Sequence, residues 1–302
     1  MKQYPSGWFA VLDSKELKNK LLGAQLFGID IVFWRKNNSE PVAMLDKCPH
    51  RSAKLSLGRK TGDCVECPFH GFQFSSDGVC QYAPEFNSAL PSLKTKTFYC
   101  REFKGFIWIW TGEEEPIGNI PWLNELNDNF LYSQLKSNWN SDVTRCVENQ
   151  LDFTHLPFVH KSTIGKGFKF NQKRLIKNSA EKIEIFLNSE KSDQPANVEF
   201  LYPNIWINRI SSKFILLLAF VPIEQGKTKL YLRSYQNYIK IPLLKNIFSF
   251  FVNLLNYFIL KQDQSVVLSQ GKAPSTENNN EVLMENDLAI RHFRKFWSKE
   301  LK

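Results

Sequence analysis

Two short cysteine–histidine pairs limit what the first part of this chain can fold into. One is Cys48-Pro-His50, and the other, after sixteen intervening residues, is Cys67-Pro-Phe-His70. Ligands this close in sequence can share a loop tip, and two such tips together supply two thiolates and two imidazoles. That set suits a tetrahedral zinc ion, or a [2Fe–2S] cluster with cysteines on one iron and histidines on the other. Cys64 keeps the zinc alternative open, because it forms a further Cys-x2-Cys pair with Cys67.

A second histidine cluster lies downstream, in the stretch Asn149-Gln-Leu-Asp-Phe-Thr-His-Leu-Pro-Phe-Val-His160. Asp152 and His155 would share one face of a helix, and we expect Pro157 to end that helix so that His160 turns back beside His155. Two histidines and one carboxylate, with open positions, are a known ligand set for Fe(II) that reacts with O2. Taken alone, the pattern also fits two structural histidines at a helix end.

Alternating apolar and turn residues predict a small β domain followed by a larger mixed domain. The expected strands are 8–12, 29–34, 42–45, 98–102 and 106–110 in the first part, and 130–135, 183–187, 205–210, 214–220 and 230–238 in the second. The expected helices are 144–155, 243–268 and 280–301. An acidic stretch with Pro and Gly at 112–121 predicts the boundary, which gives domains 1–115 and 116–302.

Charge and cysteine content indicate an ordinary reduced, globular protein. The net charge is +9, but the lysines are scattered, so we expect no nucleic-acid partner. Six cysteines are too few for a secreted disulfide scaffold, and the N-terminal residues lack a secretion signal, so we expect a cytoplasmic protein. The most apolar stretch, 247–260, is interrupted by asparagines and shorter than the roughly 18 residues that cross a bilayer, so we predict no spanning segment.

Both clusters together resemble one enzyme family. Cys-Pro-His-Arg and Cys-Pro-Phe-His-Gly-Phe-Gln-Phe resemble the Rieske motif, and Asn-x2-Asp-x2-His-x4-His resembles the catalytic-domain pattern of Rieske non-haem iron oxygenases. The resemblance runs from Tyr4 to Trp297 and is closest to the short monooxygenase and demethylase branch, which includes vanillate demethylase. It implies an α+β fold, with an N-terminal all-β Rieske domain. A helix-grip (START-like) catalytic domain would follow, in which an antiparallel sheet wraps a long C-terminal helix.

The resemblance implies two metal centres. Cys48 and Cys67 would bind one iron of a Rieske [2Fe–2S] cluster, and His50 and His70 the other. The mononuclear Fe(II) would be bound by His155, His160 and Asp263. Asp287 is the rival for the third position, but it lies in a polar stretch, whereas Asp263 follows an apolar one and a metal ligand needs a shaped, largely apolar cavity.

Asp152 has a separate role in this resemblance. It would join the iron ligand His155 to the residue equivalent to His70 in a neighbouring subunit, which requires a head-to-tail homotrimer. A simpler role, in which Asp152 only orients His155, is compatible with the same contact.

The implied reaction uses O2 and electrons from NAD(P)H, delivered by a separate ferredoxin or flavin reductase. The product would be a hydroxylated or oxidatively demethylated small hydrophobic or aromatic molecule. Alternatives are dioxygenase chemistry, a pure Rieske electron-transfer protein, and a ligand-binding module without catalysis. The phenylalanines of 247–260 would either line the substrate cavity or belong to the plain core.

Overall fold

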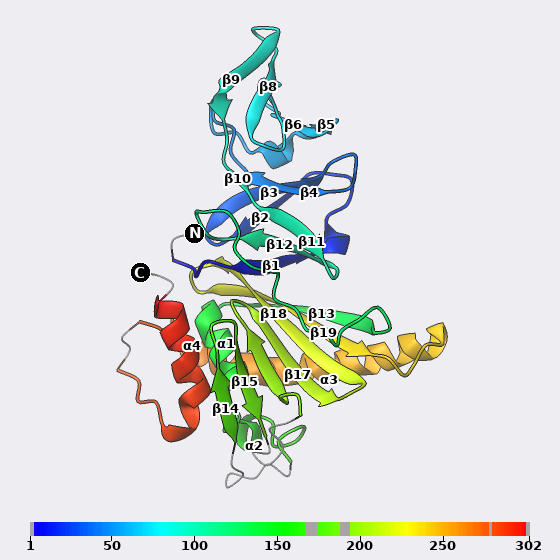
Figure 1. Ribbon diagram of the computed structural model, residues 1–302, viewed down its shortest axis with the longest axis vertical. Coiled ribbons are helices and arrows are strands. Elements are labelled where there is room, and N and C mark those ends of the chain that lie inside the picture. The colour runs from blue at the N-terminus through cyan, green and yellow to red at the C-terminus, as the bar shows by residue number, and fades with distance from the viewer. Residues whose placement is uncertain (1–2, 167–173, 188–193, 278–279, 300–302) are drawn as a thin grey trace. The chain divides into compact units, whose positions relative to one another are not determined.

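The computed structural model describes residues 3–166, 174–187, 194–277 and 280–299, which form two compact units (Figure 1). Unit 1 comprises Ser6–Ile120, and unit 2 is mainly Pro121–Lys302. The chain passes from one unit to the other within the acidic stretch that also contains Pro and Gly. The functional division at 115/116 stays a prediction.

Unit 1 contains only strands and short 3-10 turns in its described part. Its strands are β1 (Trp8–Asp13), β2 (Leu22–Leu26), β3 (Ile29–Arg35), β4 (Pro41–Leu45), β5 (Arg59–Thr61), β6 (Cys64–Glu66), β7 (Gln73–Phe74), β8 (Val79–Ala83), β9 (Ser88–Lys94), β10 (Thr97–Phe98), β11 (Cys100–Phe103) and β12 (Phe106–Trp110). They form three antiparallel sheets, in the orders β1–β12–β11, β10–β4–β3–β2 and β5–β6–β7–β8–β9. The predicted all-β first part is confirmed.

The core of unit 1 extends up to the cysteines of the first cluster. Trp34, Val65 and Phe74 are fully buried and belong to the same apolar cluster as Cys48 and Cys67. Their burial excludes water from one side of the two thiols. The apolar packing thus supports the loops that carry the cysteines.

Unit 2 is built on one seven-stranded antiparallel sheet. Its strands are β13 (Leu131–Trp139), β14 (Leu175–Asn178), β15 (Lys182–Phe186), β16 (Val198–Leu201), β17 (Ile205–Ser211), β18 (Phe214–Glu224) and β19 (Lys227–Gln236). The order is β13–β19–β18–β17–β16–β15–β14. Because β13 pairs with the last strand of the sequence, residues separated by about a hundred positions meet in this sheet.

Four α-helices of the described residues accompany the sheet. They are α1 (Val143–Leu151), α2 (Leu156–Val159), α3 (Pro242–Ser269) and α4 (Leu288–Lys299). The long helix α3 packs against β13 and β19, and α4 is tied to α1 by an ion pair between Arg294 and Glu148 at 2.8 Å. The predicted α+β class, with an all-β part followed by an antiparallel sheet and a long helix, is confirmed.

Two expected helix boundaries are wrong around the second histidine cluster. Helix α1 ends at Leu151 and does not reach His155, because Asp152 adopts an extended conformation at its C-terminal end. Pro157 lies in the first turn of α2, so it helps to begin a helix where we expected it to end one. Proline is tolerated there because a first-turn N–H has no partner within the helix.

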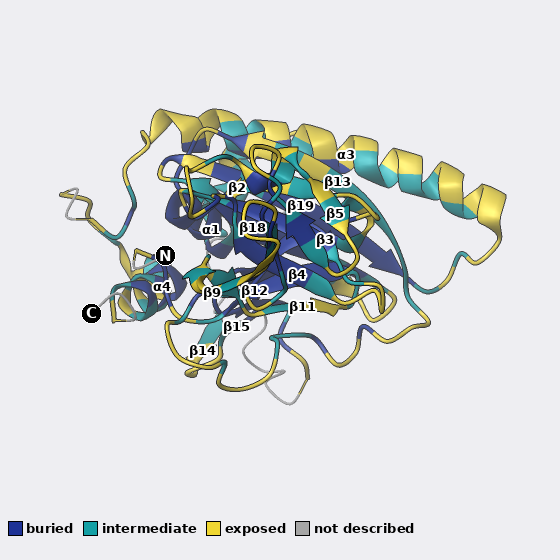
Figure 2. Ribbon diagram, turned by 90° about the horizontal axis from the view of Figure 1, so that it is seen from above, coloured by how far each residue is buried: buried dark blue, intermediate teal, exposed yellow. Residues whose placement is uncertain are grey.

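Helix α3 also differs from expectation. Phe248 packs edge-on against Phe214 and Tyr238, as a core residue would. Phe250, Phe251, Tyr257 and Phe258 are exposed and belong neither to a cavity wall nor to the core. Figure 2 shows how much of α3 is exposed.

With 28 residues, α3 is long and apolar enough to cross a membrane by length and composition alone, whereas the 247–260 stretch predicted no spanning segment. The second half of α3 packs within unit 2, since Leu260, Asp263 and Val267 are buried.

Candidate metal centres

The two loops of the first cluster have the same backbone design. In the first loop, Ser52 N–H donates to the carbonyl oxygen of Cys48, and Cys48 N–H donates to that of Ala53. In the second loop, Gly71 N–H donates to the carbonyl oxygen of Cys67 in the equivalent position. Ser52 and Gly71 both adopt the left-handed conformation, with φ of 60° and 72°. Each Cys-to-His segment is therefore a tight, closed turn.

The donor groups of these loops point to different environments. Cys48 and Cys67 are 1% and 2% exposed, whereas His50 and His70 lie at the surface with ring centroids 4.7 Å apart. Burial raises the pKa of the Cys48 thiol to about 11, and the neighbouring Cys67 adds to the increase. Two buried thiols and two exposed imidazoles fit an iron–sulfur cluster that is anchored by its cysteines and exchanges electrons through its exposed histidines.

A third cysteine near the two loops is not part of them. Cys64 lies on β6 and not at a loop tip, so it does not join the two pairs. The donors that the loop tips offer are thus two thiols and two imidazoles, the set that a [2Fe–2S] cluster with mixed ligands uses.

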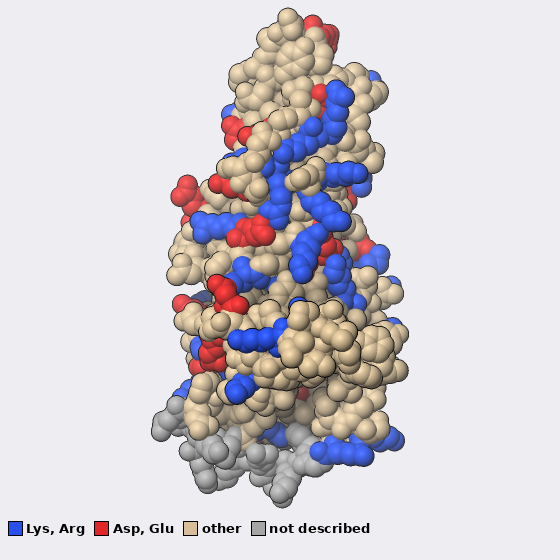
Figure 3. Space-filling model, turned by 90° about the vertical axis from the view of Figure 1, so that its right-hand side faces the viewer, with Lys and Arg blue, Asp and Glu red and all other residues tan. Residues whose placement is uncertain are grey.

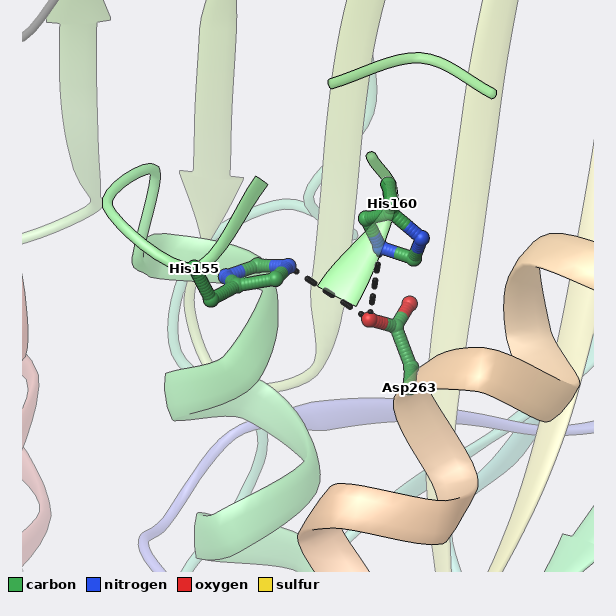
Figure 4. Close-up of side chains that lie close together, drawn as sticks. All are labelled: His155, His160 and Asp263. Carbon is green, nitrogen blue, oxygen red and sulfur yellow. Dashed lines mark hydrogen bonds and ion pairs between the residues drawn. The ribbon is translucent and has the colours of Figure 1, made fainter. Parts of the chain in front are cut away.

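Three side chains of unit 2 converge on one point (Figure 4). The Asp263 Oδ1 atom lies 2.8 Å from His160 Nε2 and 3.4 Å from His155 Nε2. One ligand atom from each residue lies within 4.8 Å of the other two. His160 and Asp263 are 1% and 2% exposed, and His155 is half-buried. The set has two imidazoles and one carboxylate, which is the donor chemistry of a non-haem Fe(II) centre.

One short helix brings the two histidines together. His155 and His160 are the residues at the two ends of α2, and His160 N–H donates to the Leu156 carbonyl oxygen. The chain after His160 folds back on this turn. A Cβ at Gly165 would lie 2.1 Å from the Leu156 carbonyl oxygen, so only glycine allows this close approach.

Two glutamines, which the sequence analysis missed, orient the ligands. Gln262 Oε1 lies 2.8 Å from His160 Nδ1, and because a carbonyl oxygen can only accept, Nδ1 donates and Nε2 keeps its lone pair for a metal. Gln150 Nε2 donates to Asp263 Oδ2 at 3.2 Å, which leaves Oδ1 facing the histidines. The only signal in the sequence is that Gln262 is adjacent to Asp263.

Asp152 lies beside the site. Its Oδ1 accepts from Thr154 N and Oγ1 at 2.6 and 2.7 Å, and its Oδ2 lies 3.4 Å from His155 Nδ1. Among the residues that the structure describes, that buried Nδ1 has no hydrogen-bond partner of good geometry. The Asp152 side chain is 25% exposed, so its carboxylate is accessible from outside the unit.

Burial and pairing compete in setting the charges of the three ligands. Burial favours the neutral form of His155, but hydrogen bonds and charge interactions with Asp152 and Asp263 outweigh it and raise the pKa of His155 to about 9. The pKa of His160 is raised in the same way by Asp263 and Gln262. Burial would raise the pKa of Asp263, but its contacts with both histidines lower it to about 2. Without metal, His155 is therefore protonated at neutral pH, and the same carboxylate favours protonation of His160.

All three predicted mononuclear ligands thus lie together, and the rival does not join them. The Asp287 carboxylate accepts from Met284 N at 2.7 Å in the turn before α4. The ligand roles themselves remain predictions.

Comparison with known proteins matches both parts of the chain. Residues 7–98 match the Rieske [2Fe-2S] domain, and residues 139–301 match the vanillate O-demethylase oxygenase C-terminal domain. The chain is 27% identical over 289 residues to chlorophyllide a oxygenase from Arabidopsis thaliana, covering 87% of this chain and 51% of that protein. It is 39% identical over 133 residues to methylxanthine N1-demethylase NdmA from Pseudomonas putida, covering 43% and 38%. The chain thus spans about half the length, or less, of these curated relatives.

Solved structures agree in fold over almost the whole chain. NdmA from Pseudomonas putida CBB5 superposes with a TM-score of 0.81 at 25% identity, covering 98% of this chain and 89% of that one. Dicamba monooxygenase bound to dicamba superposes with a TM-score of 0.77 at 20% identity, covering 98% of both chains. The second likeness shows the fold alone.

We expect Gln262→Leu to weaken Fe(II) binding at the unit 2 site by roughly 10- to 100-fold, because His160 loses the acceptor that fixes its tautomer. Gln264→Leu is the matched control, since Gln264 lies on the same helix and donates to the Asn138 carbonyl oxygen. Anaerobic Fe(II) titration of metal-depleted protein measures both affinities. Equal affinities in the two variants would contradict the role of Gln262.

We expect Fe(II) binding to release protons at neutral pH and to strengthen as pH rises towards 9, because His155 must lose a proton to bind metal and the raised pKa of His160 acts in the same direction. The raised pKa of His155 also stabilises the metal-free fold. That contribution is complete below the unfolded value of about 6.5 and is lost as pH rises through about 9. Calorimetry in two buffers of different ionisation enthalpy measures the proton release. Binding without proton release at pH 7 would contradict the assignment.

Proposed function

The chain belongs to the Rieske oxygenases that carry the vanillate O-demethylase C-terminal domain, and from this premise we propose that it uses O2 and reductase-supplied electrons to oxidise a small organic molecule. The proposed reaction is hydroxylation or oxidative demethylation of a hydrophobic or aromatic substrate. The single observation that carries the proposal is the convergence of His155, His160 and Asp263 in a chain that also holds two exposed histidines over two buried cysteines. A pure electron-transfer protein would need only unit 1.

The proposal assigns the metal-binding residues by their donor chemistry. Cys48, Cys67, His50 and His70 would hold the [2Fe–2S] cluster, and the three converging side chains of unit 2 would hold Fe(II). When bound, these groups supply one-electron transfer and the activation of O2. The protein fixes the donors in place: Gln262 sets the tautomer of His160, and Gln150 orients the carboxylate of the third ligand.

Electrons would enter at the histidine end of the cluster. Phe69 is exposed at 55%, and the Arg51 guanidinium lies over its ring at 5.3 Å. An exposed ring with a basic neighbour, in contact with the exposed His70, suits the docking of an acidic electron-transfer partner. A ferredoxin or a flavin reductase has the required chemistry.

The substrate class is proposed from the names of relatives. The relatives named above are a chlorophyllide a oxygenase and a methylxanthine demethylase, and a third is named cholesterol 7-desaturase from Drosophila melanogaster, at 33% identity over 182 residues. Their names all denote small ring compounds. We therefore propose a ring-containing, largely apolar substrate.

The anaerobically purified protein is expected to contain about three irons and two acid-labile sulfides per chain. Asp263→Ala should lower this to about two irons with unchanged sulfide and abolish substrate-dependent O2 consumption, since the buried carboxylate faces both histidines. Asp287→Ala is the control and should keep all three irons. Retention of the third iron in Asp263→Ala would overturn the ligand assignment, and zinc without sulfide would overturn the function.

We further propose a head-to-tail homotrimer in which Asp152 passes electrons from the Rieske histidine of a neighbouring subunit to His155. The accessible carboxylate beside His155 and the exposed His70 support this route. Asp152→Asn should leave iron and sulfide contents unchanged, since an amide oxygen still accepts from Thr154. It should slow single-turnover oxidation of the reduced cluster by roughly tenfold or more. The cross-subunit route would be ruled out if sedimentation velocity shows a monomer and that monomer is fully active.

A further inference from the structure

The first half of α3 exposes a large apolar surface. Its sheet-facing side mixes polar and apolar contacts: Asn256 Nδ2 donates to Ser234 Oγ at 2.9 Å, and the Phe248 ring packs against Phe214 and Tyr238. A surface helix of a globular protein normally turns polar residues towards water. Here the side that faces away from the sheet carries large exposed apolar side chains instead.

The outer face of α3 is a continuous apolar stripe. We define it by six side chains that are between 42% and 69% exposed: Leu243, Ile247, Phe250, Phe251, Leu254 and Phe258. Their spacing of four, three, one, three and four positions places them within about 100° around the helix axis. The stripe is about 22 Å long at 1.5 Å per residue. Contiguous exposed apolar surface of this kind marks an interaction site and not ordinary solvent-facing surface.

Lysines lie at the two ends of the stripe. Lys240 is exposed just before the helix, and Lys261 is exposed beyond Phe258, whereas the half-buried Lys245 lies on the other side of the helix. Between Pro242 and Gln262 the helix has no Asp or Glu. In Figure 3 the end of α3 that faces the viewer is a continuous uncharged surface.

We propose that the outer face of α3 docks on an anionic lipid bilayer and lies in the plane of its surface. Apolar side chains would enter the headgroup and acyl boundary, while the flanking lysines neutralise lipid phosphates. The exposed Tyr257 is suited to the same boundary, because tyrosine joins an apolar ring to a polar hydroxyl.

The structure favours docking in the plane of the bilayer surface over a spanning helix and over a contact between two copies of the chain. Although α3 is long and apolar enough to span a membrane, Leu260, Asp263 and Val267 are buried in unit 2, so the helix cannot leave the folded unit. Pairing of this face with the same face of a second copy is disfavoured by charge. Each face has lysines at its two ends and no carboxylate between positions 242 and 262, so two such faces would repel each other. Anionic headgroups supply the complementary charge.

The experiment is co-sedimentation of the full-length holoprotein with vesicles of phosphatidylcholine alone or mixed with phosphatidylglycerol. We expect binding to the anionic vesicles that weakens at high salt, and little binding to the neutral ones. Phe250→Ser combined with Phe251→Ser should weaken binding roughly tenfold or more, because two inserted rings are lost. The matched control is Ile117→Ser with Val282→Ser, which removes two exposed apolar side chains elsewhere.

A second variant tests the charges independently of the rings. Lys240→Glu with Lys261→Glu should abolish the preference for anionic vesicles while iron content stays unchanged. The proposal is overturned if the holoprotein stays in solution with both vesicle types, or if the control pair weakens binding as much as the phenylalanine pair. It is also overturned if the phenylalanine pair lowers the oligomeric state in sedimentation velocity without lipid, because the face would then be a contact between copies. None of these readouts measures turnover, so their failure is separate from failure of the proposed function.

Discussion

The contact between Asp263 and the two histidines is the interaction on which unit 2 depends. A carboxylate that is 2% exposed is stable only if it is paired, and the nearest cationic groups are the imidazoles at the two ends of α2. This pairing ties a one-turn helix to the long helix α3, which in turn packs on β13 and β19. The metal-free protein already has the donor positions because charge pairing holds them.

The two proposed metal centres differ in which of their ligands are buried. In unit 1 the thiols are buried and the imidazoles are exposed, so the histidine end can meet another protein. In unit 2 His160 is buried with its carboxylate partner, and water has little access. An electron-transfer site benefits from an exposed edge, whereas a site that activates O2 benefits from exclusion of water. The difference in burial therefore matches the different tasks proposed for the two centres.

The sequence predicted the fold class and the convergence of the unit 2 side chains well, and local geometry poorly. Cysteine and histidine spacing pointed to both clusters, because residues within one loop or one turn need no knowledge of the rest of the fold. Asp263 required a choice between two distant carboxylates, and the packing of α3 brings it, and not Asp287, beside the two histidines. The end of α1 at Leu151 and the turn of α2 were not predicted, because helical spacing alone does not show that Asp152 becomes extended or that Pro157 begins a new helix. Gln150 and Gln262 could not be found, since their role depends on contacts across more than a hundred positions.

The composition of α3 follows from two demands on one helix. Its inner side places Asn256 against the sheet and Asp263 beside the histidines, together with the packed ring of Phe248. Selection for solubility alone would place polar residues outside, yet the outer face carries leucine, isoleucine and phenylalanine. That face has no role in positioning the inner side chains, since their contacts lie on the opposite side of the helix. An apolar face with lysines at its two ends is the composition expected of a helix that lies on an anionic surface, which is the environment that we propose for it.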